Sequence, residues 1–208
     1  LEHPGSNVNW LSRASISGQP GDLMSPSEII DRPKDISFLL DELAILNHQP
    51  GALQGKFNTQ QVTVIGHSLG GYTALALAGA ELNLDELRRS CKSADPLSKS
   101  PAEWLQCAAA DLPERRLQLR DERVAGAIAL NPVVGQLFGK TGLMQVTIPT
   151  LILSSTEDAF TPAVNHQLQP FTQLRGAKYL LTAIGATHLS VGDSSNLGFQ
   201  RTLVQERT

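Results

Sequence analysis

Residues 66–71, with the sequence GHSLGG, are the part of the chain whose residue types and spacing most directly suggest chemistry. A serine with a glycine two positions away on either side is the pattern of a nucleophile elbow, a sharp strand-to-helix turn that exposes the serine hydroxyl. The apolar run at 62–65 and the alanine-rich run at 73–78 supply the strand and the helix that this pattern requires. We expect the flanking glycines to allow close backbone packing where a Cβ would clash. Ser68 is therefore the candidate nucleophile, and a plain glycine-rich turn is the alternative.

The start of a helix is also a suitable place for developing negative charge. Free backbone N–H groups and the helix dipole both favour an anion there. The residue after the nucleophile is Leu69, and its N–H is the candidate oxyanion donor.

A serine nucleophile needs a base and an orienting acid, and after this kind of elbow they follow in the order Asp or Glu, then His. Asp158 lies in the loop after a strand-like run at 149–155, and His188 follows a second such run at 178–184. Because parallel strands end at the same edge of a sheet, we expect Ser68, Asp158 and His188 to converge there.

Two alternatives concern the acid. Asp158 could cap a helix that opens near Pro162, and the neighbouring Glu157 could be the acid instead. With Asp158 as the acid, Ser68 attacks an ester carbonyl while His188 takes its proton and Asp158 stabilises the imidazolium. Water then releases the acyl-enzyme.

The other histidines are weaker candidates for the base. His48 and His166 lie in polar, helix-like stretches, where we expect them to be solvated. His67 adjoins the serine and is expected to shape the pocket, and His3 lies in a Pro-Gly turn.

Composition and the remaining motifs exclude several function classes. The 208 residues are 41% hydrophobic with a net charge of −3, which favours a single domain, 1–208, without a basic surface for nucleic acid. The cysteines are not in C-x-x-C spacing, and H-E-x-x-H and phosphate-binding glycine loops do not occur, so we expect neither metal nor cofactor. The apolar stretches are too short to form a transmembrane segment. The expected partner is a small-molecule ester substrate, and the oligomeric state stays open.

The motifs at 66–71, 156–158 and 186–188 together resemble the α/β-hydrolase superfamily. Segments 1–7 and 31–41 are similar to bacterial predicted dienelactone hydrolases, which are relatives of the plasma-type platelet-activating-factor acetylhydrolases. The resemblance implies an α/β-hydrolase fold, a mostly parallel sheet flanked by helices. It also implies a serine carboxylic-ester hydrolase, with lipase and thioesterase activities as variants.

Two residues depart from these relatives. Dienelactone hydrolases use a cysteine nucleophile, so Ser68 points to general ester chemistry. In the acetylhydrolases the acid follows the strand that corresponds to 124–130, where this chain has Asn131. The resemblance therefore moves the acid role to Asp158.

The beginning of the chain is the third departure. Family members carry earlier strands and a His-Gly loop that supplies a second oxyanion donor, all upstream of the segment matching 1–7. The sequence also begins without methionine, so we expect N-terminal strands to be missing. The alternative function is accordingly a catalytically idle or truncated hydrolase-fold protein that binds a small apolar ligand.

The elements around the motifs carry further expectations. A helix is predicted from about residue 26 or 33 to residue 46. Its apolar face is expected to pack on the sheet and consists of Phe38, Leu39, Leu43 and Leu46. The apolar segment 131–146 could line an acyl pocket or form a helix that buries its side chains in the core.

Segment 81–123 interrupts the alternation of strands and helices and is predicted to be a helical insertion or a lid. Trp104, Leu105 and Leu112 could face the pocket or pack against the core. Cys91 and Cys107 both lie here and could form a disulfide or remain free thiols. Localisation therefore stays open between cytoplasmic and exported.

Overall fold

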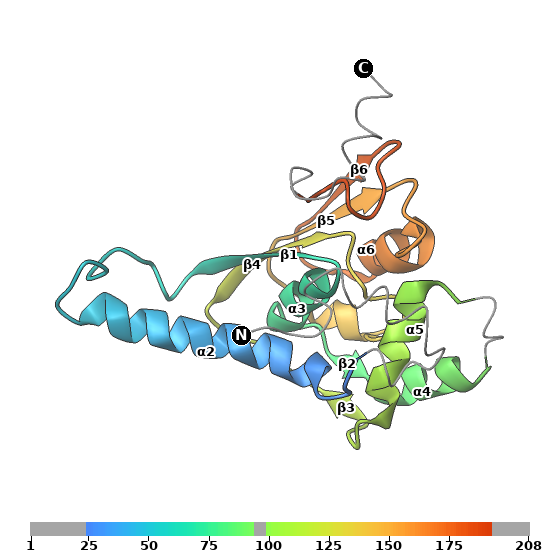
Figure 1. The fold of residues 1–208 in the computed structure, drawn as a ribbon, viewed down its shortest axis with the longest axis horizontal. Coiled ribbons are helices and arrows are strands. Elements are labelled where there is room, and N and C mark those ends of the chain that lie inside the picture. The colour runs from blue at the N-terminus through green and yellow to red at the C-terminus, as the bar shows by residue number, and fades with distance from the viewer. Residues whose placement is uncertain (1–23, 94–98, 193–208) are drawn as a thin grey trace.

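A parallel sheet carries the candidate residues in the computed structural model, which describes residues 24–93 and 99–192. The sheet has four strands in the order β1-β4-β5-β6. Their bounds are β1 Val62–His67, β4 Val124–Leu130, β5 Thr150–Ser155 and β6 Lys178–Ala183. Each neighbouring pair is parallel, so all four strands end at the same edge (Figure 1). The structure thus confirms the α/β class and the parallel sheet.

The helix after β1 covers one face of this sheet. α3, Leu69–Leu77, contacts both β1 and β4. Its sequence, LGGYTALAL, is apolar almost all round, which is typical of a buried helix. On the two outer strands of the described sheet, alternate side chains such as Ile65 and Tyr179 are more than half exposed. Among the described residues, the helical cover that we expected is therefore incomplete over these strands.

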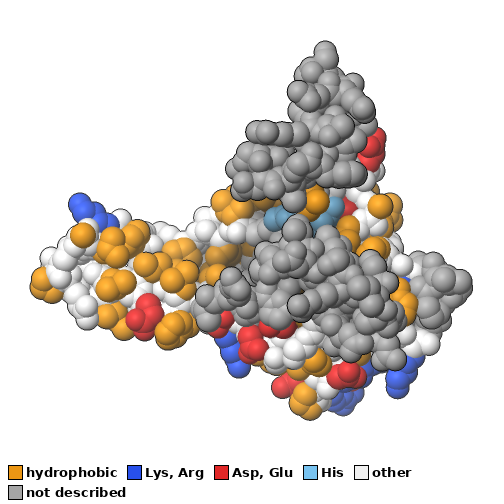
Figure 2. Space-filling view, in the orientation of Figure 1, with side chains coloured by type: hydrophobic (Ala, Val, Ile, Leu, Met, Phe, Trp, Pro, Cys, Tyr) orange, Lys and Arg blue, Asp and Glu red, His pale blue; other side chains and the backbone are white. Residues whose placement is uncertain are grey.

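The long helix α2, Glu28–His48, has most of its buried residues in its first half, and its second half contacts the rest of the molecule through an Asp41–Arg123 ion pair and hydrogen bonds between Asn47 and the Phe57 backbone. Tyr72 on α3 donates its hydroxyl to the backbone oxygen of Ile29 over 2.7 Å. The prediction of a packed apolar face is wrong for Phe38, Leu39 and Leu46, which are exposed. Figures 1 and 2 show that α2 extends beyond α3 and that hydrophobic side chains lie along its surface.

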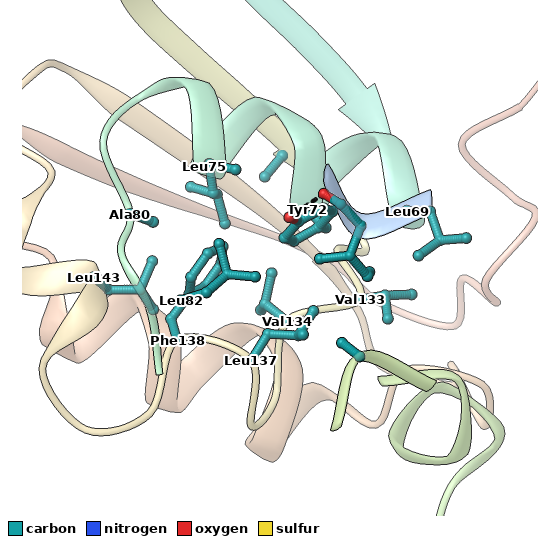
Figure 3. Close-up of a cluster of buried hydrophobic side chains, with 14 of the residues drawn as sticks. Leu69, Tyr72, Leu75, Ala80, Leu82, Val133, Val134, Leu137, Phe138 and Leu143 are labelled. Atoms are coloured by element: carbon teal, nitrogen blue, oxygen red, sulfur yellow. Dashed lines mark hydrogen bonds between the residues drawn. The ribbon is translucent and has the colours of Figure 1, made fainter. Parts of the chain in front are cut away.

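The hydrophobic core lies between α3 and the segment 131–146 (Figure 3). Tyr72 stacks on Phe138 with ring centroids 5.7 Å apart. The apolar side chains of the segment are buried, namely Val133, Val134, Leu137, Phe138 and Leu143. They reach the core from turns and a short 3₁₀ helix, η4 Gly142–Gln145, rather than from an α-helix.

Segment 81–123 forms a helical layer that is part of the same core. Its elements are β2 Leu82–Asn83, α4 Leu84–Ser93, α5 Pro101–Cys107, η3 Ala108–Asp111 and β3 Arg116–Leu117. β2 and β3 pair antiparallel. Leu105 and Leu112 are buried in the core, which corresponds to the core alternative for these two residues.

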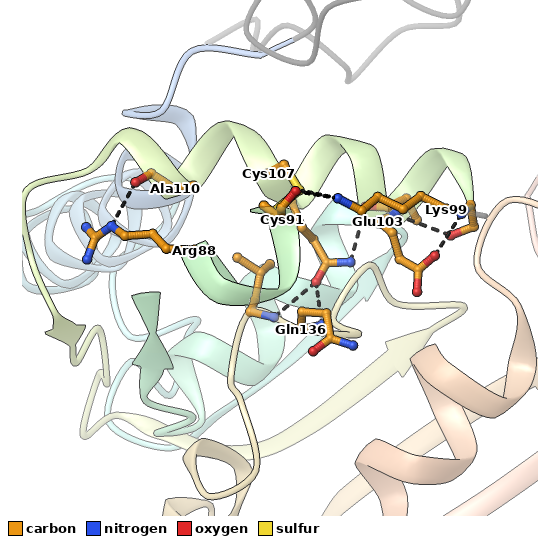
Figure 4. The surroundings of a disulfide bond; sticks show 11 residues. Arg88, Cys91, Lys99, Glu103, Cys107, Ala110 and Gln136 are labelled. Carbon is orange, nitrogen blue, oxygen red and sulfur yellow. Dashed lines mark hydrogen bonds between the residues drawn. A yellow bond between two sulfur atoms is a disulfide. The ribbon is translucent and has the colours of Figure 1, made fainter. Parts of the chain in front are cut away.

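A disulfide joins Cys91 on α4 to Cys107 on α5, with the Cα atoms 5.8 Å apart (Figure 4). Arg88 adds a second tie by donating to the backbone oxygen of Ala110 over 2.9 Å. α5 begins with a capping box between Ser100 and Glu103, which satisfies N–H groups that a helix start leaves unpaired. The disulfide thus fixes α4 to α5, and Arg88 ties α4 to η3.

The remaining elements follow β5. A π-helix, η5 Val164–Leu168, continues into α6, Gln169–Gln173, which leads to β6. Within the described residues, no helix combines the length and the apolar character needed to cross a membrane.

Candidate active site

Ser68 occupies a constrained turn between β1 and α3. Its φ of 57° lies in the left-handed region, which it shares with only one other described non-glycine residue, Asn131. Such a conformation costs on the order of 1–3 kcal/mol and persists where neighbours hold it. The Ser68 N–H donates to the backbone oxygen of Leu130, and the Ser68 backbone oxygen accepts from Tyr72 and Val133. These three bonds fix the turn at the end of the sheet.

Glycine is required at this turn, but not at every position that we expected. A Cβ on Gly66 would lie 2.0 Å from the backbone oxygen of Gly70, a clash that no side-chain movement could relieve. A Cβ on Gly71 would lie 2.8 Å from the Cβ of Pro132. No described heavy atom lies within 4 Å of a Cβ placed on Gly70. The close approach therefore depends on Gly66 and Gly71, and the expectation for Gly70 is wrong.

The structure brings Ser68, His188 and Asp158 together in one hydrogen-bonded chain. Ser68 Oγ lies 2.9 Å from His188 Nε2, and His188 Nδ1 lies 2.8 Å from Asp158 Oδ2. The three residues follow β1, β6 and β5, so the common strand ends explain the convergence. Glu157 is exposed, and its N–H bonds the backbone of Ala186. Asp158 rather than Glu157 thus contacts the histidine.

Asp158 accepts hydrogen bonds at both carboxylate oxygens. Oδ1 accepts from the N–H groups of Phe160 and Thr161, and Oδ2 accepts from the Thr161 hydroxyl over 2.6 Å as well as from His188. Burial alone would raise its pKa, but the donors at His188 and Thr161 outweigh burial and hold the pKa below its ordinary value. Asp158 therefore caps the turn at 160–161 and contacts the histidine at once, whereas the helix that opens after Pro162 has Ala163 rather than Asp158 at its N-cap.

These partners also define the tautomer of His188. An ionised Asp158 can only accept, so Nδ1 of His188 carries the proton. In the neutral ring Nε2 is then an acceptor for the Ser68 hydroxyl. His188 is poised to take the serine proton.

Two rings enclose the imidazole of His188. The ring centroids of His67 and Phe160 each lie 4.7 Å from that of His188, with the planes tilted by about 40°. His67 Nε2 also lies 2.8 Å from the backbone oxygen of His188, and Asn131 Nδ2 lies 3.2 Å from the same oxygen. His67 thus lies beside His188, and its expected part in shaping a pocket stays a prediction.

Leu69 is the first residue of α3. The first N–H groups of a helix have no acceptor within that helix. Its amide is therefore suited to receive negative charge that develops on a carbonyl bound at Ser68.

His166 was expected to be solvated, and the structure shows that this is wrong, since its side chain is fully buried. Nδ1 accepts from the N–H groups of Val134 and Gly135 over 3.3 and 3.1 Å, and Nε2 lies 3.5 Å from Ser100 Oγ. Burial lowers its pKa to about 4. His166 therefore joins the turn at 134–135 to the start of α5. His48 is exposed, as predicted.

Sequence reasoning missed the supporting roles of Thr161, Asn131 and His166. Thr161 had a detectable signal, because an Asp three positions before a Thr is an N-cap-like pattern, in which the Thr donates its N–H and its hydroxyl to the carboxylate. Asn131 and His166 had none, since their partners are distant in sequence.

A groove of about 430 Å³ lies between α2, α3 and β1. Its lining includes Phe38, Leu39, Ile65, Gly70 and Ala74. The groove reaches the elbow at Gly70 without including the three hydrogen-bonded side chains. Across the described ranges, no group of three or more His, Cys, Asp or Glu side chains could hold a metal ion.

Comparison of the sequence with protein-family models gives no match, and a search of curated proteins gives none either. The chemistry of the site is therefore argued from its geometry.

Proposed function

We propose that this protein is a serine hydrolase that cleaves carboxylic esters through Ser68, His188 and Asp158. The observation that carries the proposal is the hydrogen-bonded chain from Asp158 Oδ2 through both ring nitrogens of His188 to Ser68 Oγ. This arrangement matches the roles that nucleophilic acyl transfer requires: nucleophile, base and orienting acid.

The geometry supports a two-step reaction. Ser68 Oγ attacks the ester carbonyl as its proton moves to His188 Nε2, and the ionised Asp158 stabilises the imidazolium. The carbonyl oxygen becomes an oxyanion beside the Leu69 amide. His188 then gives its proton to the departing alcohol, which leaves an acyl-enzyme. Water, deprotonated by His188, attacks this ester, and the carboxylic acid product leaves as Ser68 regains its proton.

The chain order and the strand positions favour the α/β-hydrolase fold for this protein. Its serine follows β1 directly and opens α3, while the acid and the base follow β5 and β6. Serine, aspartate and histidine in that order, at the carboxyl edge of a parallel sheet, are typical of that fold. The sequence resemblance to dienelactone hydrolase-like and acetylhydrolase-like serine esterases points to the same class.

Hydrolysis of p-nitrophenyl esters of increasing acyl length tests the proposal. We expect the wild-type protein to turn these esters over and Ser68→Ala to lose at least about 10³-fold in kcat. A fluorophosphonate probe should label the wild type at Ser68 and leave Ser68→Ala unlabelled. Asp158→Asn should retain the fold and lose most of its activity, and full activity in that variant would remove Asp158 from the mechanism.

The groove beside α3 is the observation that favours the alternative, a catalytically idle protein that binds a small apolar ligand. Folded wild-type protein that neither hydrolyses the esters nor reacts with the probe would overturn the esterase proposal and favour that alternative.

A further inference from the structure

We propose that His67 and Asn131 are positioning residues that hold the base by its backbone: two side-chain N–H groups, from the ends of two neighbouring strands, donate to the carbonyl oxygen of His188. The proposal rests on the proposed function, because it assigns these residues a part in the same reaction. Both hydrogen bonds go to the His188 backbone oxygen, which takes no part in the reaction.

The contacts converge on one oxygen. His67, the last residue of β1, places Nε2 2.8 Å from His188 O, and Asn131, directly after β4, places Nδ2 3.2 Å from it. A carbonyl oxygen has two lone pairs, so it can accept both bonds. Asn131 Nδ2 also lies 3.0 Å from Ser155 Oγ at the end of β5. The loop after β6 is thereby tied to the ends of the other three strands.

His188 needs this attachment because the strand before it, β6, is supported by a neighbouring strand on one side only in the described sheet. β6 is an outer strand of the described sheet, with β5 as its neighbour. The ring of His188 is held by Ser68 and Asp158, but the bond to Ser68 must change as the proton moves between them. The bonds to the backbone oxygen take no part in that transfer and stay in place throughout. A misplacement of about 1 Å at a reacting group can cost about 100-fold in rate.

The orientation of the Asn131 side chain supports a specific role. The side chain is fully buried, and Oδ1 has no hydrogen-bond partner within the described chain. Leaving a buried acceptor unpaired costs about 1–3 kcal/mol. The opposite orientation would place Oδ1 against the carbonyl oxygen of His188. The amide is thus held by its donor contacts in spite of this cost.

The protonation of His67 fits the same role. Nε2 must carry a proton to donate to a carbonyl oxygen. Burial, together with the nearby His188, lowers the pKa of His67, although the bond to the His188 backbone and the charge of Asp158 oppose that shift. A neutral His67 ring donates to the loop without placing a second positive charge beside the imidazolium of His188.

Three variants test the role of His67. His67→Phe retains an aromatic ring beside His188 and removes the donor, whereas His67→Gln can present an amide N–H near the place of Nε2. We expect His67→Phe to lower kcat and the rate of fluorophosphonate labelling by about 10- to 100-fold, with KM changed less than about twofold. We expect His67→Gln to recover to within a few-fold of wild type. His48→Gln changes an exposed histidine outside the site and should behave as wild type.

Asn131→Asp tests the second donor independently. Aspartate keeps the size of the side chain and tolerates the positive φ, but once ionised, as at high pH, it cannot donate to the His188 backbone. The new charge would also raise the pKa of the base, so labelling is followed across pH. The plateau rate at high pH, where the base is neutral in either protein, should fall by about 10-fold or more if the donor positions His188.

The outcomes separate the two proposals. If folded wild-type protein does not react with the probe, the proposed function fails. If wild type reacts and folded His67→Phe and Asn131→Asp both keep its plateau rate, the positioning role is wrong. It is also wrong if His67→Gln is as slow as His67→Phe. Should His67→Phe not fold, as judged by circular dichroism and thermal unfolding, the plateau of Asn131→Asp decides.

Discussion

Asp158 holds a turn and, in the proposed mechanism, orients the histidine with the same carboxylate. The turn that it caps places Thr161 so that the threonine hydroxyl reaches the same oxygen as His188. A hydrogen bond to an ionised group contributes more than one between neutral groups. The stability of this turn and the charge on the acid are therefore coupled.

Thr161→Val should destabilise the protein by about 1.5–3 kcal/mol at neutral pH, because it removes a donor to a buried carboxylate. The pKa of Asp158 is lowered in the folded protein, so the contribution of its ionised form is present above the ordinary pKa. It is lost as pH falls through the lowered folded value. The difference from wild type should therefore shrink on acidification. Urea unfolding between about pH 3 and pH 7 measures it, and Thr161→Ser, which keeps the hydroxyl, should remain close to wild type.

The burial of His166 leads us to expect a second pH dependence of the stability of the protein. Its pKa in the folded protein is about 4 against 6.5 for a free side chain, because burial disfavours the charged ring. The lowered value means that stability is full above about pH 6.5 and falls as pH drops toward 4, by about 3 kcal/mol in total. Glu103 and Asp158 favour the charged ring, and His188 opposes it.

The matched variant is His166→Asn, which offers Oδ1 as an acceptor near the place of Nδ1 and does not titrate. We expect its stability to depend less on pH between about 6.5 and 4 than that of wild type. Thermal unfolding across that range measures the difference, and equal pH slopes in the two proteins would contradict the role of His166.

At the scale of elements, the junction of β1 and α3 depends on Gly66 more than on Gly70. Gly66→Ala would place a Cβ 2.0 Å from the backbone oxygen of Gly70, so strand and helix would have to separate. We expect a loss of about 3 kcal/mol or more. Gly70→Ala meets open space within the described chain and replaces a poor helix former, so it should be neutral or stabilise by less than about 1 kcal/mol. Urea unfolding of both variants measures the contrast, and a similar loss in both would contradict it.

The disulfide between α4 and α5 is the second feature at this scale that we expect to determine the stability of the protein. It closes a loop with a sequence separation of 16 residues. In the chain-entropy account, a cross-link of this length stabilises by about 3 kcal/mol. Cys91→Ser combined with Cys107→Ser should lower the free energy of unfolding by about that amount. A reductant should destabilise wild type and leave the double variant unchanged; insensitivity of wild type to the reductant would refute the prediction.

Patterns in the sequence predicted the helices and strands better than they predicted which surfaces pack against one another. β1, β5 and β6 were predicted because short apolar runs precede loops with polar residues. The same reasoning failed for α2, because periodicity gives the apolar side of a helix but not the surface that covers it. Phe38 and Leu39 are exposed although they face α3, because the groove that they line between α2, α3 and β1 is open.

At the scale of the whole molecule, the candidate triad was predictable and its support was not. Each of Ser68, Asp158 and His188 follows a strand, so the edge rule for parallel sheets brings them together. Asn131 and His166 depend on neighbours 57 and 32 positions away. Nothing in the local sequence around them specifies these partners, and His166 even lies in a polar stretch.

The distance along the chain between Ser68 and His188, 120 positions, has a consequence during synthesis. A ribosome makes β1, β4 and β5 before β6, so the growing chain carries its serine and its aspartate for some time without the histidine. At that stage the candidate base is absent, so in the proposed mechanism the hydroxyl has no group to take its proton. With Ser68 as the proposed nucleophile, chemical competence arrives only when β6 has joined the sheet, and the order of translation protects a half-made chain from premature acylation.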